Sequence, residues 1–165
     1  MIECSLFGAC KSVKRLEDYF VKQNYRKSEF EYQELIYKDE KSEYILQMTT
    51  PIKIVYKGSP DLNKTRIAVC RRIIECTLLN ECSIETFFDI LGMKKIKDSK
   101  ICGIKFTKND IAVEIVKKNK DENLFLIQAS TIKNNIKEGE KRIEDFKLEI
   151  NRMVALVKPQ LSIFN

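Results

Sequence analysis

Alternation of apolar and polar residues between Glu29 and Lys57 is the feature that most constrains the fold of this chain. Phe30 and Tyr32 alternate with polar neighbours, and the phase then slips by one residue, as a β-bulge would produce. The later apolar positions are Leu35, Tyr37, Tyr44, Leu46, Met48, Ile52, Ile54 and Tyr56. Turn-forming residues occur at 39–41 and at Thr50-Pro51. The segment therefore predicts three antiparallel strands joined by short connections.

Strand-like runs also lie on both sides of this segment. They are residues 2–7, 65–78, 93–101, 103–106, 111–116 and 124–129, and the closing "QLSIF". We expect Gly8 to end the first strand and to turn the chain into a helix. Ser12 is placed to cap that helix, and the apolar spacing predicts that it ends near Asn24.

Two more helices are predicted. The stretch "SIETFFDIL" begins at Ser83 and is followed by Gly92 as a C-cap, and its apolar stripe is Ile84, Phe87, Phe88 and Leu91. Between Glu138 and Lys158 apolar residues recur every three or four positions, which describes one face of a long helix. Pro159 is expected to end it.

A chain of strands with few helical crossovers tends to close on itself, because closure removes free sheet edges. We therefore expect an α+β fold, a mostly antiparallel closed β-barrel with two short helices and one long C-terminal helix packed outside. The 165 residues are enough for one hydrophobic core, so residues 1–165 are expected to form one domain that includes the helix at 138–158.

The composition excludes several classes of active site. The chain has no histidine, which removes the usual general base, the usual Ser or Cys triads and mixed Cys/His zinc sites. No run is long and apolar enough to span a membrane, and no signal peptide is evident, so we expect an intracellular protein. The six cysteines are accordingly expected to be free, buried thiols, with Cys70 and Cys76 in the core.

Paired carboxylates are the strongest candidate for a catalytic site. Glu29 and Glu31 are two residues apart on a strand, so their side chains share a face and can hold a divalent cation. With Arg66, Arg72 and Lys105 on the same inner surface, such a site would bind and polarise a triphosphate. The alternative is an ordinary half-exposed strand that buries Phe30 and Tyr32 and leaves both carboxylates in solvent.

Sites for anionic ligands receive little support from the sequence. No phosphate-binding glycine loop occurs, and the net charge of +6 comes from interspersed basic and acidic residues. The basic stretch "MKKIKDSK" at 93–100 can meet phosphate, but lysines that protect a solvated strand edge are the commoner explanation. We expect no direct, specific contact with nucleic acid.

The order of these elements resembles the subunit 18 family of Mediator, the coactivator of RNA polymerase II transcription. The residues that carry the resemblance are "ECSLFG", "VKRLEDYFV", "FEYQELIYK", "YILQM", "RIAVCRRIIECTLL", "SIETFFDILGMK", "GIKFTKNDIAVEIVK", "LFLIQAS" and "VALVKPQLSIF". They span nearly the whole chain, which has the compact loops of a short member.

This resemblance implies a barrel related in fold to tunnel triphosphatases but without their set of carboxylates. Glu3, on the first strand, has no acidic partner two residues on, and the late strands offer only Glu114. The implied role is non-enzymatic, needs no cofactor or metal, and lies in the nucleus. The implied partners are subunit 20, as a heterodimer, and a helix of subunit 8 in the Mediator head.

Tyr37, Tyr44 and Tyr56 are the candidates for partner contacts, because they lie near strand ends and aromatic residues often anchor interfaces. The alternative is that they are ordinary residues of the sheet. The competing function is a metal-dependent tunnel-type triphosphatase acting on RNA or nucleoside triphosphates, with Glu29 and Glu31 as its metal ligands.

Overall fold

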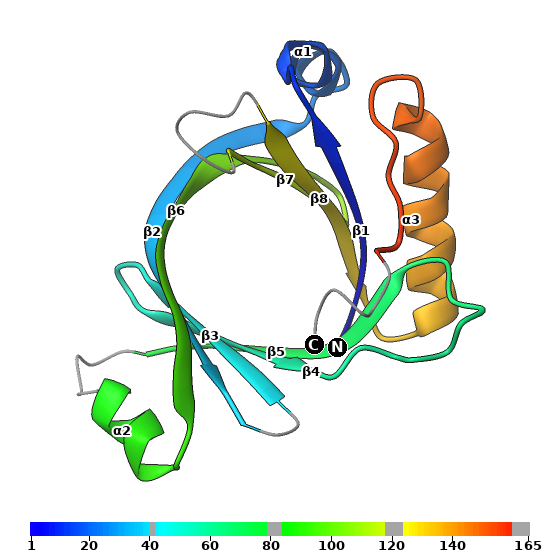
Figure 1. Ribbon diagram of the computed structural model, residues 1–165. Helices are drawn as coiled ribbons and strands as arrows, with labels where there is room; N and C mark the ends of the chain where they lie inside the picture. The colour runs from blue at the N-terminus through cyan, green and yellow to red at the C-terminus, as the bar shows by residue number, and fades with distance from the viewer. Residues whose placement is uncertain (40–41, 79–83, 118–123, 160–165) are drawn as a thin grey trace. The chain divides into compact units, whose positions relative to one another are not determined.

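A computed structural model describes residues 1–39, 42–78, 84–117 and 124–159. Over these residues it contains eight β-strands and three helices, so the fold is α+β (Figure 1). The strand pairs β1–β8, β2–β3, β3–β4, β4–β5, β6–β7 and β7–β8 are antiparallel. None of the helices in this part of the chain is long and apolar enough to cross a membrane. The elements are, in chain order, β1 Ile2–Cys10, α1 Lys14–Lys22, β2 Arg26–Lys38, β3 Ser42–Met48, β4 Lys53–Gly58, β5 Val69–Thr77, α2 Ile84–Ile90, β6 Lys94–Lys108, β7 Ile111–Lys117, β8 Phe125–Lys133 and α3 Ile136–Ile150.

The chain divides into two compact units. The first unit comprises Met1–Phe30, Asp61–Cys70 and Cys102–Asn165, and the second comprises Glu31–Pro60 and Arg71–Ile101. Strands β2, β5 and β6 each contribute residues to both units. Over the described residues, the first unit has one buried apolar cluster and the second has two, and the units are described in turn.

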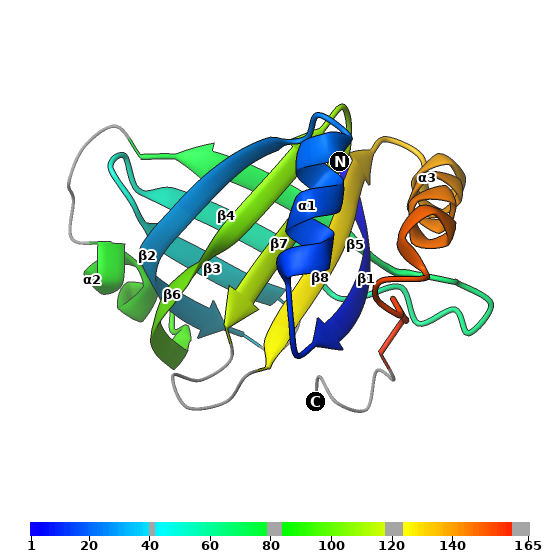
Figure 2. The same cartoon turned by 90° about the horizontal axis from the view of Figure 1, so that it is seen from above.

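In the first unit, β1 pairs with β8, β8 with β7, and β7 with the second half of β6. Helices α1 and α3 pack on one face of this sheet, with α3 running along β1 and β8 (Figures 1 and 2). The alternation along β7 selects that face, because Ile111, Val113 and Ile115 are buried and the residues between them are less so. Two helices on one face of the sheet thus complete the core of this unit.

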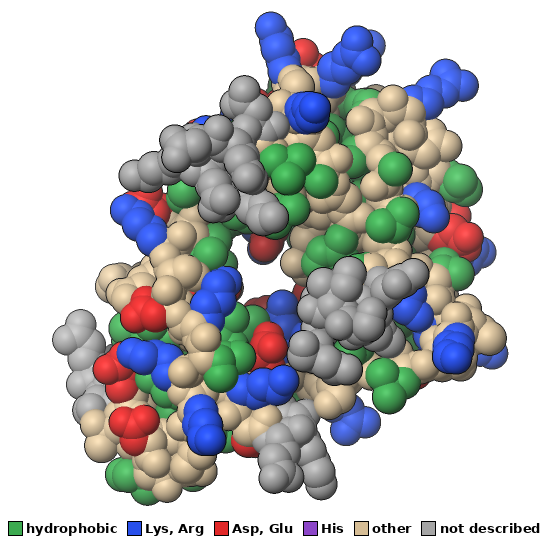
Figure 3. Space-filling model, viewed as in Figure 1, with side chains coloured by type: hydrophobic (Ala, Val, Ile, Leu, Met, Phe, Trp, Pro, Cys, Tyr) green, Lys and Arg blue, Asp and Glu red, His purple; other side chains and the backbone are tan. Residues whose placement is uncertain are grey.

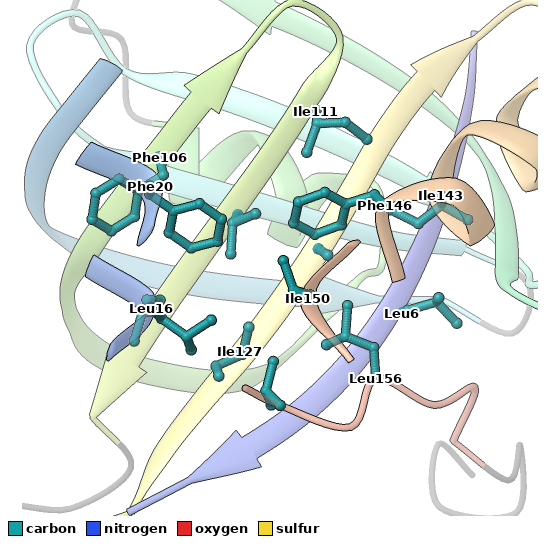
Figure 4. Close-up of a cluster of buried hydrophobic side chains, with 14 of the residues drawn as sticks. Leu6, Leu16, Phe20, Phe106, Ile111, Ile127, Ile143, Phe146, Ile150 and Leu156 are labelled. Atoms are coloured by element: carbon teal, nitrogen blue, oxygen red, sulfur yellow. The ribbon is translucent and has the colours of Figure 1, made fainter. Parts of the chain in front are cut away.

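Aromatic rings occupy the centre of this core. Phe20 of α1 lies 4.9 Å from Phe106 of β6 and 6.3 Å from Phe146 of α3 between ring centroids (Figure 4). Ile143 and Ile150 lie on the same side of α3 as Phe146, and all three are fully buried. The sequence prediction of an apolar face on the C-terminal helix is confirmed at these positions.

In the second unit, β2, β3, β4 and β5 pair in order, as antiparallel neighbours. The three strands predicted between Glu29 and Lys57 are therefore confirmed. Helix α2 packs on this sheet through Ile84 and Phe88, and the Phe88 ring stacks on Tyr37 with 4.7 Å between ring centroids. Gly92 follows α2 with a φ of 71°, which supports the predicted C-cap, although Ser83 lies outside the described residues.

The start of the chain differs from the prediction at two points. Gly8 does not end the first strand, because β1 continues through it to Cys10. A Cβ at Gly8 would lie 2.9 Å from the backbone oxygen of Ala155, so this glycine permits close approach of another chain segment rather than a turn. Ser12 does not cap α1 either, because the N-cap is Val13, whose side chain makes no capping bond.

The C-terminal helix is shorter than predicted and begins earlier. Asn135 caps α3 by accepting a hydrogen bond from the backbone N–H of Lys137 at 2.8 Å, and the helix ends at Ile150 rather than near Lys158. Beyond the helix the chain is irregular, yet some of its apolar residues are still buried. This irregular segment pairs with β1, where Phe7 and Val157 exchange backbone hydrogen bonds of 2.9 and 2.8 Å. The apolar spacing predicted a longer helix because the buried residues after Ile150 happen to continue the same period.

Two strand boundaries also need correction. The two strands predicted at 93–101 and 103–106 form one long strand, β6. Gly103 does not interrupt this strand, and it lies against Phe30 and Ile115. The strand predicted over 65–78 begins only at Val69. Before it, Arg66 is held by side-chain contacts to Asp61 and Glu140, which replace strand pairing there. The predicted closing strand "QLSIF" lies outside the described residues, which end at Pro159.

Candidate functional site

The two carboxylates proposed as metal ligands are both exposed on β2. Glu31 forms an ion pair with Lys100 of β6, and its side chain is 62% exposed. Within the described residues, no group of three or more Asp, Glu or Cys side chains is placed to hold a metal ion. The geometry around Glu31 is that of a surface ion pair, which stabilises the fold only weakly.

The cations expected beside these carboxylates pair with other acids. Arg66 contacts Asp61 at 2.9 Å and Glu140 of α3 at 3.0 Å. Its hydrogen bonds to these two carboxylates raise the pKa of Arg66, and a backbone hydrogen bond from Asn63, followed by that from Arg66, lowers the pKa of Asp61. Arg66 therefore holds the loop before β5 against α3.

Lys105 likewise pairs with an acid other than the two proposed carboxylates. Nζ of Lys105 contacts Oε1 of Glu114 at 2.8 Å across β6 and β7, where the two residues are direct partners in the register. Arg72 is exposed on β5 in the second unit. The structure therefore gives Arg66 and Lys105 acidic partners other than Glu29 and Glu31.

A polar strip crosses the face of the first unit's sheet that α1 and α3 leave uncovered. It consists of Lys105, Glu114, Gln128 and Ser5 on the neighbouring strands β6, β7, β8 and β1, and Nε2 of Gln128 lies 3.5 Å from Oγ of Ser5. Sequence reasoning did not find Gln128 or Ser5. The sequence shows on which face of its own strand each of these residues lies, because side chains alternate. It does not show which residues of neighbouring strands come side by side, because that depends on the strand register.

The sequence predicts that the lysines at 93–100 protect an open strand edge. The structure shows ion pairs there instead. In the second unit, Lys97 contacts Glu34 of β2 at 2.9 Å, and Gln33 donates a hydrogen bond to Asp98 at 2.9 Å. Lys100 pairs with Glu31 in the same way. Lys97 and Lys100 therefore form ion pairs with acidic residues of β2, the neighbouring strand. Figure 3 shows basic and acidic side chains interspersed over β6 and α2.

The three tyrosines proposed as partner contacts gather around α2. The Tyr44 ring lies 5.6 Å from Phe88 and 5.2 Å from Tyr56, between ring centroids. Tyr37 is only 1% exposed beneath Phe88, whereas Tyr44 and Tyr56 are partly exposed. Burial raises the pKa of both Tyr37 and Tyr44. A partner that binds here therefore meets Tyr44 and Tyr56 rather than Tyr37.

Helix α2 adds an apolar surface that the sequence did not single out. Phe87, Ile90 and Leu91 are 52%, 80% and 54% exposed, although Phe87 and Leu91 had been assigned to the buried stripe. Only Ile84 and Phe88 point into the unit, because a helix of two turns offers a narrow face to a sheet. Clusters of exposed apolar side chains of this kind are typical of protein contact surfaces.

The cysteines divide into buried and exposed groups. Cys4 and Cys70 are buried, as predicted, and Cys10 is partly buried. Cys76 and Cys102 are exposed, so the prediction that Cys76 belongs to the core is wrong. Cys76 lies opposite Ile54 of β4 in the register of the two strands. Cys82 lies outside the described residues.

A model of the family described as Med18 protein matches residues 9–160, nearly the whole chain. The chain belongs to this family. The resemblance to the Mediator subunit 18 family inferred from the sequence is thereby confirmed. No curated protein sequence matches the chain.

Solved structures share the fold of this Med18-family chain at low sequence identity. A chain in the structure of the Schizosaccharomyces pombe Mediator head module aligns with a TM-score of 0.77 at 12% identity, covering 96% of this chain and 99% of that chain. The PH1012 protein of Pyrococcus horikoshii aligns with a TM-score of 0.72 at 14% identity, covering 90% of each chain.

An enzyme is also among the structural neighbours. A putative adenylyl cyclase from Hippeastrum, described as having a dominant triphosphatase activity, aligns with a TM-score of 0.57 at 10% identity, covering 93% of this chain and 89% of that chain. At this identity the likeness concerns the fold alone.

Proposed function

We propose that this protein is a non-enzymatic structural subunit of the Mediator complex, which regulates transcription by RNA polymerase II in the nucleus. The match of the Med18 family model to residues 9–160 carries the proposal. The likeness in fold to a chain of the S. pombe Mediator head module supports a place in the head. The exposed apolar side chains of α2 support a role through protein–protein contacts.

Affinity purification of the tagged protein from native extract tests this proposal. We expect other Mediator subunits to be recovered with it at stoichiometric amounts, and mass spectrometry of the eluate identifies them. Recovery as a free monomer from extracts in which Mediator itself is intact would contradict the proposal.

The specific partners follow from the family resemblance. We propose a heterodimer with subunit 20 and attachment by a helix of subunit 8. Pairwise co-expression tests each contact separately, with size-exclusion chromatography as the measurement. If neither subunit changes the elution volume of this chain, the pairing is wrong even if the chain enters Mediator through other subunits.

Tyr44 and Tyr56 are proposed as anchors in one of these contacts, with Tyr37 supporting them from beneath through Phe88. We expect a Tyr44→Ala and Tyr56→Ala double variant to weaken binding by about tenfold or more, as loss of aromatic anchors does. Leu148→Ala, which removes an exposed apolar side chain of α3 in the first unit, is the control and should bind normally.

We further propose that the eight strands close into one barrel and one domain, related to the tunnel triphosphatase fold. The strand order β1-β5-β4-β3-β2-β6-β7-β8 supports this, because β1 and β8 also pair with each other and a ring leaves no free edge. Hydrogen exchange measures the outcome. Closure predicts protected amides along both sides of every strand, and an unprotected side on β5 or β2 would contradict it.

Triphosphate hydrolysis is the competing function, favoured by the fold it shares with the Hippeastrum protein. We expect no phosphate release from RNA or nucleoside triphosphates with Mg²⁺ or Mn²⁺, because Glu31 is paired with Lys100. Turnover that a Glu29→Gln and Glu31→Gln double variant abolishes would establish the enzyme instead.

A further inference from the structure

Two buried thiols lie against each other in the first unit. Sγ of Cys4, on β1, lies 3.5 Å from Sγ of Cys70, at the start of β5. The two side chains are 0% and 2% exposed. A disulfide needs the sulfur atoms about 2.05 Å apart, so the two sulfurs have to approach by about 1.5 Å to form a bond.

Helix α3 confines the Cys4 thiol on its other side. A Cβ at Gly139, in the first turns of α3, would lie 2.6 Å from Sγ of Cys4, so only a glycine leaves room for the sulfur there. The backbone oxygen of Ile136 lies 3.9 Å from the same sulfur. Because the helix blocks one side, Cys70 is the nearest reactive group that Cys4 can approach.

The two thiols are also electronically unlike. The hydrogen bond between the two sulfurs, in which either can be the donor, lowers the pKa of Cys70, while the same hydrogen bond and burial raise the pKa of Cys4. The nearby Glu140 carboxylate raises the pKa of both thiols, and the guanidinium of Arg66 lowers it. A thiolate formed on either cysteine lies within 3.5 Å of the other sulfur.

We propose that Cys4 and Cys70 are a reversible oxidation site, at which a hydroperoxide converts the two thiols into a disulfide. The thiolate of one cysteine attacks one peroxide oxygen, the O–O bond breaks, hydroxide leaves from hydrogen peroxide, and that cysteine becomes a sulfenic acid. The sulfur of the other cysteine then attacks the sulfenic acid sulfur, an S–S bond forms and the oxygen leaves as water. Two thiols lose two electrons in total, and the peroxide gains them.

The disulfide would join residues 66 positions apart and tie β1 to the start of β5 beneath α3. A crosslink over a loop of this length restricts the unfolded chain strongly. We therefore expect oxidation to raise the thermal midpoint by roughly 10 °C, and a thiol reductant to reverse the change.

Peptide mapping of the oxidised full-length protein tests the proposal. The Cys76→Ser and Cys102→Ser double variant removes the two thiols that are exposed among the described residues and compete for peroxide, and it leaves Cys4 and Cys70 in place. After peroxide treatment of the folded variant, we expect mass spectrometry without reduction to find the Cys4–Cys70 linked peptide as the main disulfide. The same treatment in concentrated guanidinium chloride should give a mixture of pairings.

Cys70→Ser provides the matched control, since it keeps the size of the side chain and should leave Cys4 reduced. If that variant does not fold, the comparison of folded and denatured protein still decides the question. The proposal is overturned if folding does not enrich the Cys4–Cys70 pair. It is equally overturned if Cys70 is oxidised to sulfinic acid while Cys4 stays free, or if the linked protein melts no higher than the reduced one.

Discussion

Gly103 shows how tightly a single residue is constrained in the first unit. Placed within β6, it has no room for a side chain, because an added Cβ would lie 2.8 Å from Cζ of Phe30 and closer still to the backbone oxygen of Ile115. A backbone oxygen in a paired strand cannot move without breaking the register between β6 and β7. The glycine is therefore required by packing rather than by its backbone angles.

We expect Gly103→Ala to lower the free energy of unfolding by about 1–3 kcal/mol, the range of an overpacked core. Urea denaturation followed by circular dichroism measures it. Gly58→Ala in β4 is the control, because its added Cβ would meet no atom nearer than 3.5 Å. Equal stability losses in the two variants would show that glycine flexibility, and not space, sets the effect.

Phe20 is the residue with the largest expected contribution to the core of the first unit. Its ring is fully buried and contacts the rings of Tyr25, Phe106 and Phe146. Phe20→Ala should therefore cost about 3–5 kcal/mol of stability. Phe87→Ala, at an exposed aromatic of α2, should change stability by less than about 0.5 kcal/mol. Calorimetric melting of both variants distinguishes a packed aromatic core from a general aromatic effect.

At the scale of elements, an ion cluster joins α3 to the turn before β7 and the end of β8. Asp110 contacts Lys133 at 2.7 Å and Arg142 at 2.9 Å, and its side chain is 26% exposed. Partial burial raises the pKa of Asp110, but hydrogen bonds from Lys133 and Arg142 outweigh it, so the pKa lies below its usual value. The cluster therefore stabilises the position of α3 only while Asp110 is ionised.

A lowered pKa in the folded state gives this stabilisation a defined dependence on pH. It is fully present above the pKa of Asp110 in the unfolded chain, about 3.9, and it is lost as the pH falls through the lower folded pKa. We expect Asp110→Asn to lower stability at neutral pH by about 1–2 kcal/mol and to flatten the acid limb of the stability profile. An unchanged acid limb in denaturation curves measured across pH 2 to about 6 would contradict this.

Elements with a regular apolar period were predictable, whereas their ends were not. The alternation in β2, β3 and β4 and the buried face of α3 at Ile143, Phe146 and Ile150 follow from the sequence because one face of each is buried. The end of α3 does not, since Val154 and Leu156 are buried after the helix has stopped. Gly8 was misread because the neighbour that requires a glycine, Ala155, is distant in sequence.

The same limit applies to the candidate sites. The exposed positions of Glu29 and Glu31 follow from strand alternation, but their partners do not, because Lys100 comes beside Glu31 only through strand pairing. Likewise, spacing along one strand cannot show that Cys4 meets Cys70, 66 positions away in the sequence. Sequence patterns thus locate faces of elements, while contacts between distant elements need the fold.

At the scale of the whole molecule, the two units differ in how much apolar surface they bury. The cluster of the first unit joins residues of five strands and two helices, whereas the clusters of the second unit are smaller. Amides open at a free energy set by local burial, up to that of global unfolding. We expect amides of β7, β8 and α3 to exchange most slowly with deuterium, and those of β3 and β4 to exchange earlier. Uniform protection in a mass-spectrometric exchange experiment would contradict this difference.

The pairing of β1 has a consequence for how the protein is made. β1 is synthesised first, yet it pairs with β8 from Ile2–Lys133 to Cys10–Phe125, and Phe7 pairs with Val157. At typical translation rates the first strand emerges from the ribosome roughly ten seconds before these partners exist. During that time its apolar side chains lack their native partners, and exposed apolar surface of this kind favours aggregation. A ribosome that stops before residue 125 would release a chain whose first strand lacks its β8 partner.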